Sequence, residues 1–160
     1  MAMFNALLRF TTCIIGVILS LYALHVEIAK EKDADFKAMC DISEKMSCSK
    51  VFNSKYGTGF GIIGPVLGES SMFNVPNSIY GIAFYLLTMT LGFARSNQTA
   101  AKLLVFTSLI ACVGCVYLAY ILYFILNDFC VVCFITYILN FFLLFLNHQN
   151  YRQQRKNKQD

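Results

Sequence analysis

Charged residues are scarce in this chain of 160 residues. They make up 14% of it, while hydrophobic residues make up 58% and the mean hydropathy is +0.59. Soluble domains carry roughly 25% charged residues, so a soluble domain of this length would need more polar surface than the sequence supplies. The shortage of charge excludes an ordinary soluble domain and predicts membrane-spanning segments.

Other absences narrow the possibilities further. The sequence has no metal-ligand motif and no nucleotide-binding motif, so we expect no metal and no tightly bound cofactor. Its net charge of +4 is too modest to indicate a nucleic-acid partner. The first apolar segment lacks a small-residue cleavage site and is longer than the core of a signal peptide, so we interpret it as a retained span. No internal repeat divides the single domain of residues 1–160.

Long apolar segments are present instead. Each has few or no charges, and each approaches or exceeds the roughly 17–25 residues that a span requires; they are residues 7–29 (with Arg9, His25 and Glu27 near the ends), 78–94, 101–126 and 129–146. Backbone in lipid must satisfy its own hydrogen bonds, so segments of this length are helices. We therefore predict an all-α integral membrane protein, a bundle of four transmembrane helices with a large loop at residues 30–77.

Charge and cysteine placement predict the orientation. Four spans put both termini on one side, and that side carries seven Lys and Arg residues in short segments, against six spread along the long loop. By the positive-inside rule this side is the cytosol, which includes the tail of residues 149–160. Cys40, Cys48, Cys130 and Cys133 fall on the other side, as expected for a disulfide-permissive lumen. The glycosylation sequon at Asn97 then lies in the cytosol and is predicted to be unmodified.

The long loop divides into two parts. Residues 33–56 carry apolar side chains at roughly helical spacing, which predicts a helix. Residues 57–65 are apolar but too broken by glycine for a regular helix. We expect this second part to lie on the membrane or to cap the bundle; an ordinary flexible loop is the alternative.

A dithiol, Cys130-Val131-Val132-Cys133, lies at the predicted start of the fourth span. Asn127 or Asp128 is expected to cap that helix, which leaves Cys130 in the first turn, where the helix dipole favours a thiolate. Two thiols one turn apart at a membrane boundary can meet both a lipid-soluble molecule and an aqueous thiol. The alternative is a pair of inert cysteines packed in an apolar helix.

Polar side chains follow the dithiol along the same helix. At about 100° per residue, Cys133, Tyr137 and Asn140 fall on one narrow stripe. Polar groups inside a span usually face the bundle or a cavity, so Tyr137 can offer its hydroxyl to a molecule docked above the thiol. Alternatively, Tyr137 and Asn140 only join helices. Asn77, before the second span, is either a helix cap or an amide that faces a ligand at the depth of Cys133.

The remaining cysteines differ in depth. Cys40 and Cys48 lie in the long loop, where they form either a static bridge or a shuttle that exchanges with the pair at the membrane edge. Cys112-Val113-Gly114-Cys115 lies midway along the third span, where no aqueous thiol reaches and a thiolate is strongly disfavoured. We expect no redox role for this second pair or for Cys13, and we attribute the small residues there to close helix packing.

Several short motifs occur in collinear order along nearly the whole chain: Leu21-Tyr22-Ala23-Leu24-His25-Val26, Cys40-Asp41, Ser47-Cys48-Ser49, Gly59-Phe60-Gly61, Asn77-Ser78-Ile79, Tyr117-Leu118-Ala119 and Cys130-Val131-Val132-Cys133 with Thr136-Tyr137. Together they resemble the vitamin K epoxide reductase family. Residues 120–124 and 139–141 and the Lys158-Gln159-Asp160 ending are more similar to its "like-1" paralogue branch than to the main warfarin target. Family members carry serine at the position of Cys115, so the second pair is not a family feature.

The resemblance implies a role for each of four cysteines. Cys133 matches the cysteine that reacts with substrate, and Cys130 matches its disulfide partner. Cys48 matches the loop thiol that exchanges with Cys130. Cys40 matches the thiol that faces outside reductants.

The resemblance also implies substrate-binding residues and a location. Asn77 and Tyr137 match residues that hydrogen-bond the quinone oxygens. Phe52 matches a residue that lines the pocket, which also binds coumarin anticoagulants. The Lys156-x-Lys158 ending resembles a cytosolic retrieval signal for the endoplasmic reticulum membrane.

The activity implied by the resemblance is reduction of vitamin K 2,3-epoxide to the quinone and of the quinone to hydroquinone, with a dithiol as electron donor. Such an enzyme supports the vitamin K cycle and the supply of antioxidant hydroquinone. The implied partners are the bilayer and a luminal thioredoxin-like reductant. Two alternatives stay open: a quinone-linked enzyme that forms disulfides in secreted proteins, and a structural four-span protein with a loop disulfide.

Overall fold

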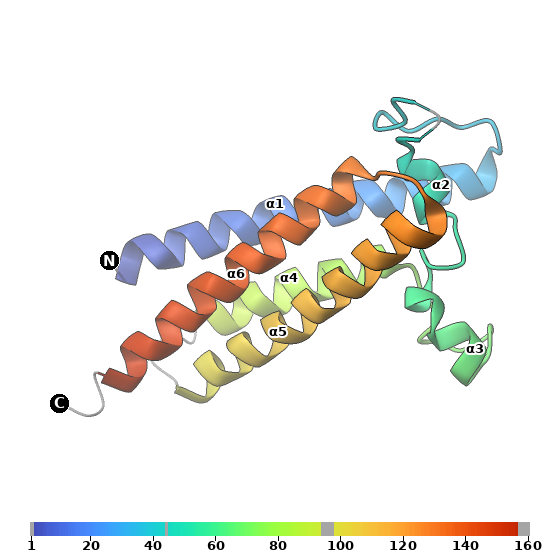
Figure 1. Ribbon diagram of the computed structural model, residues 1–160. Coiled ribbons are helices and arrows are strands. Elements are labelled where there is room, and N and C mark those ends of the chain that lie inside the picture. The colour runs from blue at the N-terminus through green and yellow to red at the C-terminus, as the bar shows by residue number, and fades with distance from the viewer. Residues whose placement is uncertain (1, 44, 94–97, 157–160) are drawn as a thin grey trace.

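The computed structural model describes residues 2–43, 45–93 and 98–156, and within these ranges the chain is helical with no β-strand. Its four long helices form an elongated bundle (Figure 1): α1 (Ala2–Lys32), α4 (Asn77–Phe93), α5 (Gln98–Tyr120) and α6 (Val131–Lys156). Helix α1 packs against α4 and α6, and α5 packs against α6 and α4. Three features named above lie outside the described residues. They are the sequon at Asn97, Ala94 at the end of the predicted second span, and the Lys158-Gln159-Asp160 ending.

Three helical segments of the described chain are long and apolar enough to cross a membrane: Met3–Lys32, Gln98–Leu126 and Val131–Lys156. Helix α4 is also apolar, but its 17 residues place it at the short limit of a span. Large apolar side chains such as Phe106, Val116 and Phe145 are exposed on the outside of the bundle. A surface of this kind suits lipid rather than water, which agrees with the predicted all-α membrane fold.

Helices α1 and α4 approach each other closely where a glycine faces an aromatic ring. A Cβ atom added at Gly16 would lie 2.4 Å from the ring of Tyr85, which is 1% exposed. The Tyr85 hydroxyl donates a hydrogen bond to the Asn140 side chain of α6 at 2.9 Å. Gly16 therefore allows α1 to pack against a tyrosine that also links α4 to α6.

The segment between α1 and α4 lies at one end of the bundle, and the first turn of α1 and the last turn of α6 lie at the other (Figure 1). The helix predicted over residues 33–56 is wrong, because only α2 (Cys48–Phe52) is helical there. The Asp41 carboxylate accepts hydrogen bonds from the backbone N–H groups of Ala38 and Ser49. Such local bonds between side chain and backbone compete with helix formation.

The glycine-rich part of the loop contains the short 3₁₀ helix η1 (Gly59–Gly61) and the five-residue helix α3 (Ile63–Leu67). Glycine was predicted to prevent a regular helix over residues 57–65. This prediction is correct as far as η1 but wrong from Ile63, where α3 begins. Gly59, Phe60 and Gly61 have φ values of 53°, 58° and 69°. This left-handed run turns the chain back towards the bundle, and glycine on both sides of Phe60 makes the turn possible.

Candidate redox centre and its cavity

Cys130 caps the N-terminus of α6. Its sulfur accepts the backbone N–H of Cys133 at 3.2 Å, and its carbonyl accepts the N–H of Phe134 at 3.0 Å. These are the bonds that an N-cap residue makes, with sulfur in place of the usual side-chain oxygen. The prediction of a cap at Asn127 or Asp128, with Cys130 in the first turn, is therefore wrong. Asn127 instead ends the π-helical turn η2 (Ile121–Leu126) in a left-handed conformation, with φ 49°.

Four cysteines converge at the end of the bundle that the loop covers. Cys40 and Cys48 are joined by a disulfide, whereas Cys130 and Cys133 are free thiols. The sulfur of Cys48 lies 3.7 Å from the sulfur of Cys130, and both side chains are fully buried. The loop disulfide and the helix dithiol are therefore in van der Waals contact through Cys48 and Cys130.

Contacts on both sides of this junction hold the loop in place. The Phe129 backbone N–H donates to the Lys45 carbonyl at 2.9 Å, and the Lys50 ammonium lies 4.0 Å from the Asp128 carboxylate. Burial raises the pKa of the Asp41 carboxyl, but hydrogen bonds from Ser49, Ala38 and Ser47 outweigh it and hold this pKa below its usual value. The ionised Asp41 side chain thus organises the turn that carries both loop cysteines.

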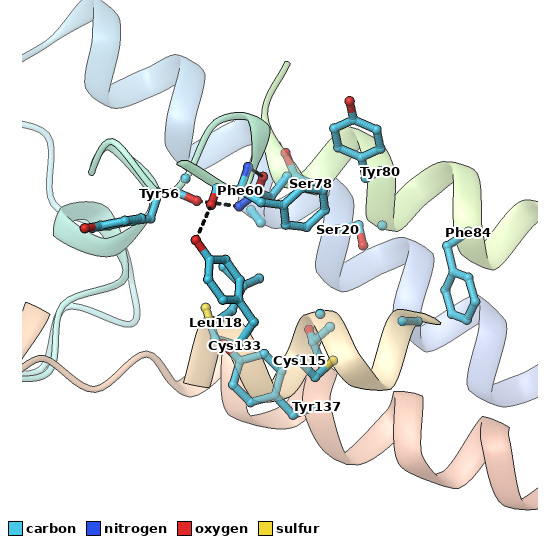
Figure 2. A pocket seen from close by; sticks show the side chains of 18 of the residues that line it. Ser20, Tyr56, Phe60, Ser78, Tyr80, Phe84, Cys115, Leu118, Cys133 and Tyr137 are labelled. Carbon is cyan, nitrogen blue, oxygen red and sulfur yellow. Dashed lines mark hydrogen bonds between the residues drawn. The ribbon is translucent and has the colours of Figure 1, made fainter. Parts of the chain in front are cut away.

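A cavity of about 800 Å³ lies between the long helices and the loop, with a mostly apolar wall. Cys133 lines it, whereas Cys130 is not among the lining residues. Asn77, Tyr137 and Phe52 line it too. Figure 2 shows Cys133, Cys115 and Tyr137 on one side of the cavity, opposite Phe60 and the serines of α1 and α4. The two cysteines of the helix pair thus face different neighbours: the cavity for Cys133 and the loop disulfide for Cys130.

The turn at Phe60 closes one side of the cavity. Its N–H donates to the Asn77 side-chain oxygen at 2.8 Å, and its carbonyl accepts the Tyr117 hydroxyl at 3.2 Å (Figure 2). The Asn77 amide nitrogen donates to the Tyr56 carbonyl at 2.6 Å. Because a side-chain amide has two N–H groups, Asn77 keeps one donor for a ligand while it holds the turn.

The second cysteine pair is buried within α5, with Cys112 4% and Cys115 5% exposed. Cys115 nevertheless borders the cavity, and its sulfur accepts a hydrogen bond from the Asn140 amide at 3.0 Å. A Cβ atom added at Gly114 would meet nothing within 4 Å. Close helix packing therefore does not explain the glycine in this motif, and that interpretation is wrong at Gly114.

Among the lining residues for which the sequence predicted no role, Glu27 and Tyr117 make hydrogen bonds that shape the site. Glu27 is 5% exposed, lines the cavity from α1 and accepts the Ser78 hydroxyl at 2.6 Å. Tyr117 fixes the Phe60 turn. Glu27 could have been found as the one acid of a largely apolar segment, on the same helical face as Ala23. Tyr117 belongs to the Tyr117-Leu118-Ala119 motif, but the sequence does not reveal its hydrogen bond, because the partner is a backbone carbonyl 57 residues away in the sequence.

Comparison with known proteins shows the family to which the chain belongs. A profile described as "Vitamin K epoxide reductase family" matches residues 7–148. Vitamin K epoxide reductase complex subunit 1 of Rattus norvegicus is 44% identical over 107 residues, and that of Mus musculus is 45% identical over 108 residues. The alignments cover 67% and 68% of this chain and 66% of each relative, just under two thirds of the length of these relatives. The chain belongs to the vitamin K epoxide reductase family.

Proposed function

We propose that the protein reduces vitamin K 2,3-epoxide to the quinone, and the quinone to hydroquinone, with thiols as electron donors. The observation that carries the proposal is the position of Cys133. Its thiol lines an apolar cavity, and the sulfur of its neighbour Cys130 contacts a loop disulfide. Electrons can therefore enter through the loop and leave into a molecule that partitions into the membrane.

In the proposed reaction, the Cys133 sulfur attacks a ring carbon of the epoxide, forming a C–S bond as a C–O bond breaks. Cys130 then attacks the Cys133 sulfur. A disulfide forms, the electron pair returns to the ring, and the oxygen leaves as water with the two thiol protons. With the quinone as substrate no oxygen leaves, and the electron pair and the protons produce hydroquinone.

The loop disulfide and the helix dithiol suggest how the enzyme is recharged. The Cys48 thiol opens the 130–133 disulfide, and Cys40 then closes on Cys48, so that two electrons pass inward. The product of that exchange has a 40–48 disulfide and free thiols at Cys130 and Cys133, which is the arrangement in the structure. A luminal thioredoxin-like protein would reduce Cys40–Cys48 again.

The cavity supports binding of a quinone ring. Its volume of about 800 Å³ falls within the roughly 300–1,000 Å³ of small-molecule sites. We assign hydrogen bonds to the quinone oxygens to the free N–H of Asn77 and to the Tyr137 hydroxyl, and a packing role to Phe52. Coumarin anticoagulants would compete for the same space, because, like the quinone, they are flat bicyclic molecules that carry carbonyl oxygens.

We further propose a location in the endoplasmic reticulum membrane, with four spans, both termini in the cytosol and the redox centre in the lumen. The start of α1 and the end of α6 lie at one end of the bundle, as this topology requires, and the disulfide-bearing loop lies at the other (Figure 1). We assign the chain to the "like-1" branch on the motifs at residues 120–124 and 139–141.

Epoxide reduction by membranes that contain the full chain, with added dithiothreitol, tests the proposed function. Wild-type protein should produce the quinone, and Cys133→Ser should abolish production. Cys112→Ser is the matched control, because Cys112 is a buried cysteine that does not line the cavity, and it should retain the wild-type rate. If the wild type makes no quinone, the reductase function is wrong and a structural role for the loop disulfide becomes the better account.

A further inference from the structure

One carboxyl group lies on the wall of the cavity and has no part in the thiol exchange described above. Glu27 is the only acidic residue among the described lining residues, which include no Lys, Arg or His. Its side chain is 5% exposed. An ionisable group in apolar surroundings without a cationic partner is costly, so its presence within a membrane helix points to function.

Glu27 is level with the redox centre. Ala23 and Val26, which flank it on α1, belong to the same buried apolar cluster as Cys48 and Cys130, and Cys133 packs against this cluster. On the other side, Ser78 of α4 holds the carboxylate through a 2.6 Å hydrogen bond, directly after Asn77. Glu27 therefore lines the cavity that Cys133 and Asn77 also line, close to the buried cluster of the dithiol on one side and bonded to the neighbour of Asn77 on the other.

We propose that Glu27 carries the proton between the Cys133 thiol and the substrate oxygen, an inference that rests on the proposed function. The carboxylate accepts the Cys133 proton as the C–S bond forms, and then donates it to the oxygen whose C–O bond breaks. Cys130 supplies the second proton when the disulfide forms and the oxygen leaves as water. The two thiols thus provide both electrons and both protons, and Glu27 is unchanged at the end of the cycle. Ser78 is a positioning residue that fixes the carboxylate.

The test compares Glu27→Gln with wild type in full-length protein in membranes, with vitamin K epoxide and dithiothreitol. Glutamine keeps the shape and can still accept the Ser78 hydrogen bond, but it cannot transfer a proton. We expect kcat to fall about 100-fold or more, the usual contribution of general acid–base catalysis, while KM changes little. Glu27→Asp keeps the carboxyl and should recover part of the rate. Glu31→Gln, at an exposed position one turn further along α1, removes the same charge and should act as wild type.

A second measurement separates proton transfer from a structural effect. Dithiothreitol should reduce the 130–133 disulfide of Glu27→Gln at the wild-type rate, because this step does not involve the substrate. Maleimide labelling of the thiols that are released measures the rate. The inference is overturned if Glu27→Gln keeps the wild-type kcat, or if substrate turnover and disulfide reduction fall together. Absence of turnover in wild type would instead overturn the proposed function itself.

Discussion

The sulfur of Cys48 lies 3.7 Å from the sulfur of Cys130, although the disulfide partner of Cys48 is Cys40. Disulfide exchange requires one sulfur to approach a disulfide and displace the other, so Cys48 can change partners with little movement of the backbone. Cys130 in turn caps α6 and is one helical turn from Cys133. The contacts thus run from Cys40 through Cys48 and Cys130 to Cys133, the order that the proposed electron transfer requires.

The contact between Cys48 and Cys130 predicts a specific cross-link. In the double variant Cys40→Ser, Cys133→Ser, these two thiols lose their other partners and should form a disulfide under mild oxidation, detected by peptide mass spectrometry. The matched control is Cys40→Ser, Cys130→Ser, which leaves Cys48 with Cys133 and should cross-link far less. Equal yields in the two variants would contradict the assigned order.

Loss of a loop cysteine should change the activity with a protein reductant much more than the activity with a small reductant. Cys40→Ala and Cys48→Ala leave the Cys130–Cys133 pair intact, so epoxide reduction with dithiothreitol should stay within about twofold of wild type. With a thioredoxin-like protein as reductant, both variants should lose nearly all activity, because such a protein reaches the pair only through the loop. Initial rates with each reductant provide the measurement. Full activity of Cys48→Ala with the protein reductant would refute the relay.

The structure of the loop should depend on ionised Asp41. Because its pKa is held below the usual 3.8, its contribution to loop stability is fully present above that pH and is lost as the pH falls through the lower, folded value. In Asp41→Asn, amide hydrogen exchange over residues 38–49 should be about tenfold faster than in wild type at neutral pH, the loss expected from one strong hydrogen bond. This ratio should approach one in strong acid.

The control for this experiment is Asp35→Asn, which removes an exposed carboxylate from the same loop. It should leave exchange over residues 38–49 unchanged at every pH. A ratio for Asp41→Asn that stays constant from neutral to acidic pH would mean that the Asp41 charge does not stabilise the turn.

Much of the bundle was predictable from the sequence, because a membrane span depends on a long run of apolar residues and little else. The predicted segments 101–126 and 129–146 agree with α5, η2 and α6 to within a few residues, except that α6 continues to Lys156. The sequence also placed Cys112 and Cys115 within the third span, and both lie in α5, but Cys115 borders the same cavity as Cys133.

The loop and the junctions were not predictable by the same reasoning. Helical spacing suggested a helix over residues 33–56, but four hydrogen bonds to Asp41 and the Cys40–Cys48 disulfide hold most of that segment in turns. Capping rules favour oxygen side chains and therefore pointed to Asn127 or Asp128 rather than Cys130. Glu27 was treated as a charge near the end of a span, because its direction towards the cavity depends on how α1 packs.

Two glycines of the bundle should respond oppositely to substitution by alanine. Gly16→Ala places a methyl group 2.4 Å from the buried Tyr85 ring, so we expect a loss of roughly 1–3 kcal/mol in stability from overpacking. Gly114→Ala meets nothing within 4 Å and should be neutral or stabilising by up to about 1 kcal/mol, because alanine favours a helix. Thermal unfolding in detergent measures both. A Gly16→Ala variant as stable as wild type would contradict the close approach of α1 and α4.

The most direct test of the account is a single turnover without external reductant. The Cys40→Ala, Cys48→Ala variant is reduced, freed of dithiol and mixed with excess vitamin K epoxide, and product and disulfides are then quantified by mass spectrometry. We predict one equivalent of quinone per chain together with a Cys130–Cys133 disulfide. Formation of quinone while both cysteines remain thiols, or no quinone from the reduced protein, would contradict the central role of this pair.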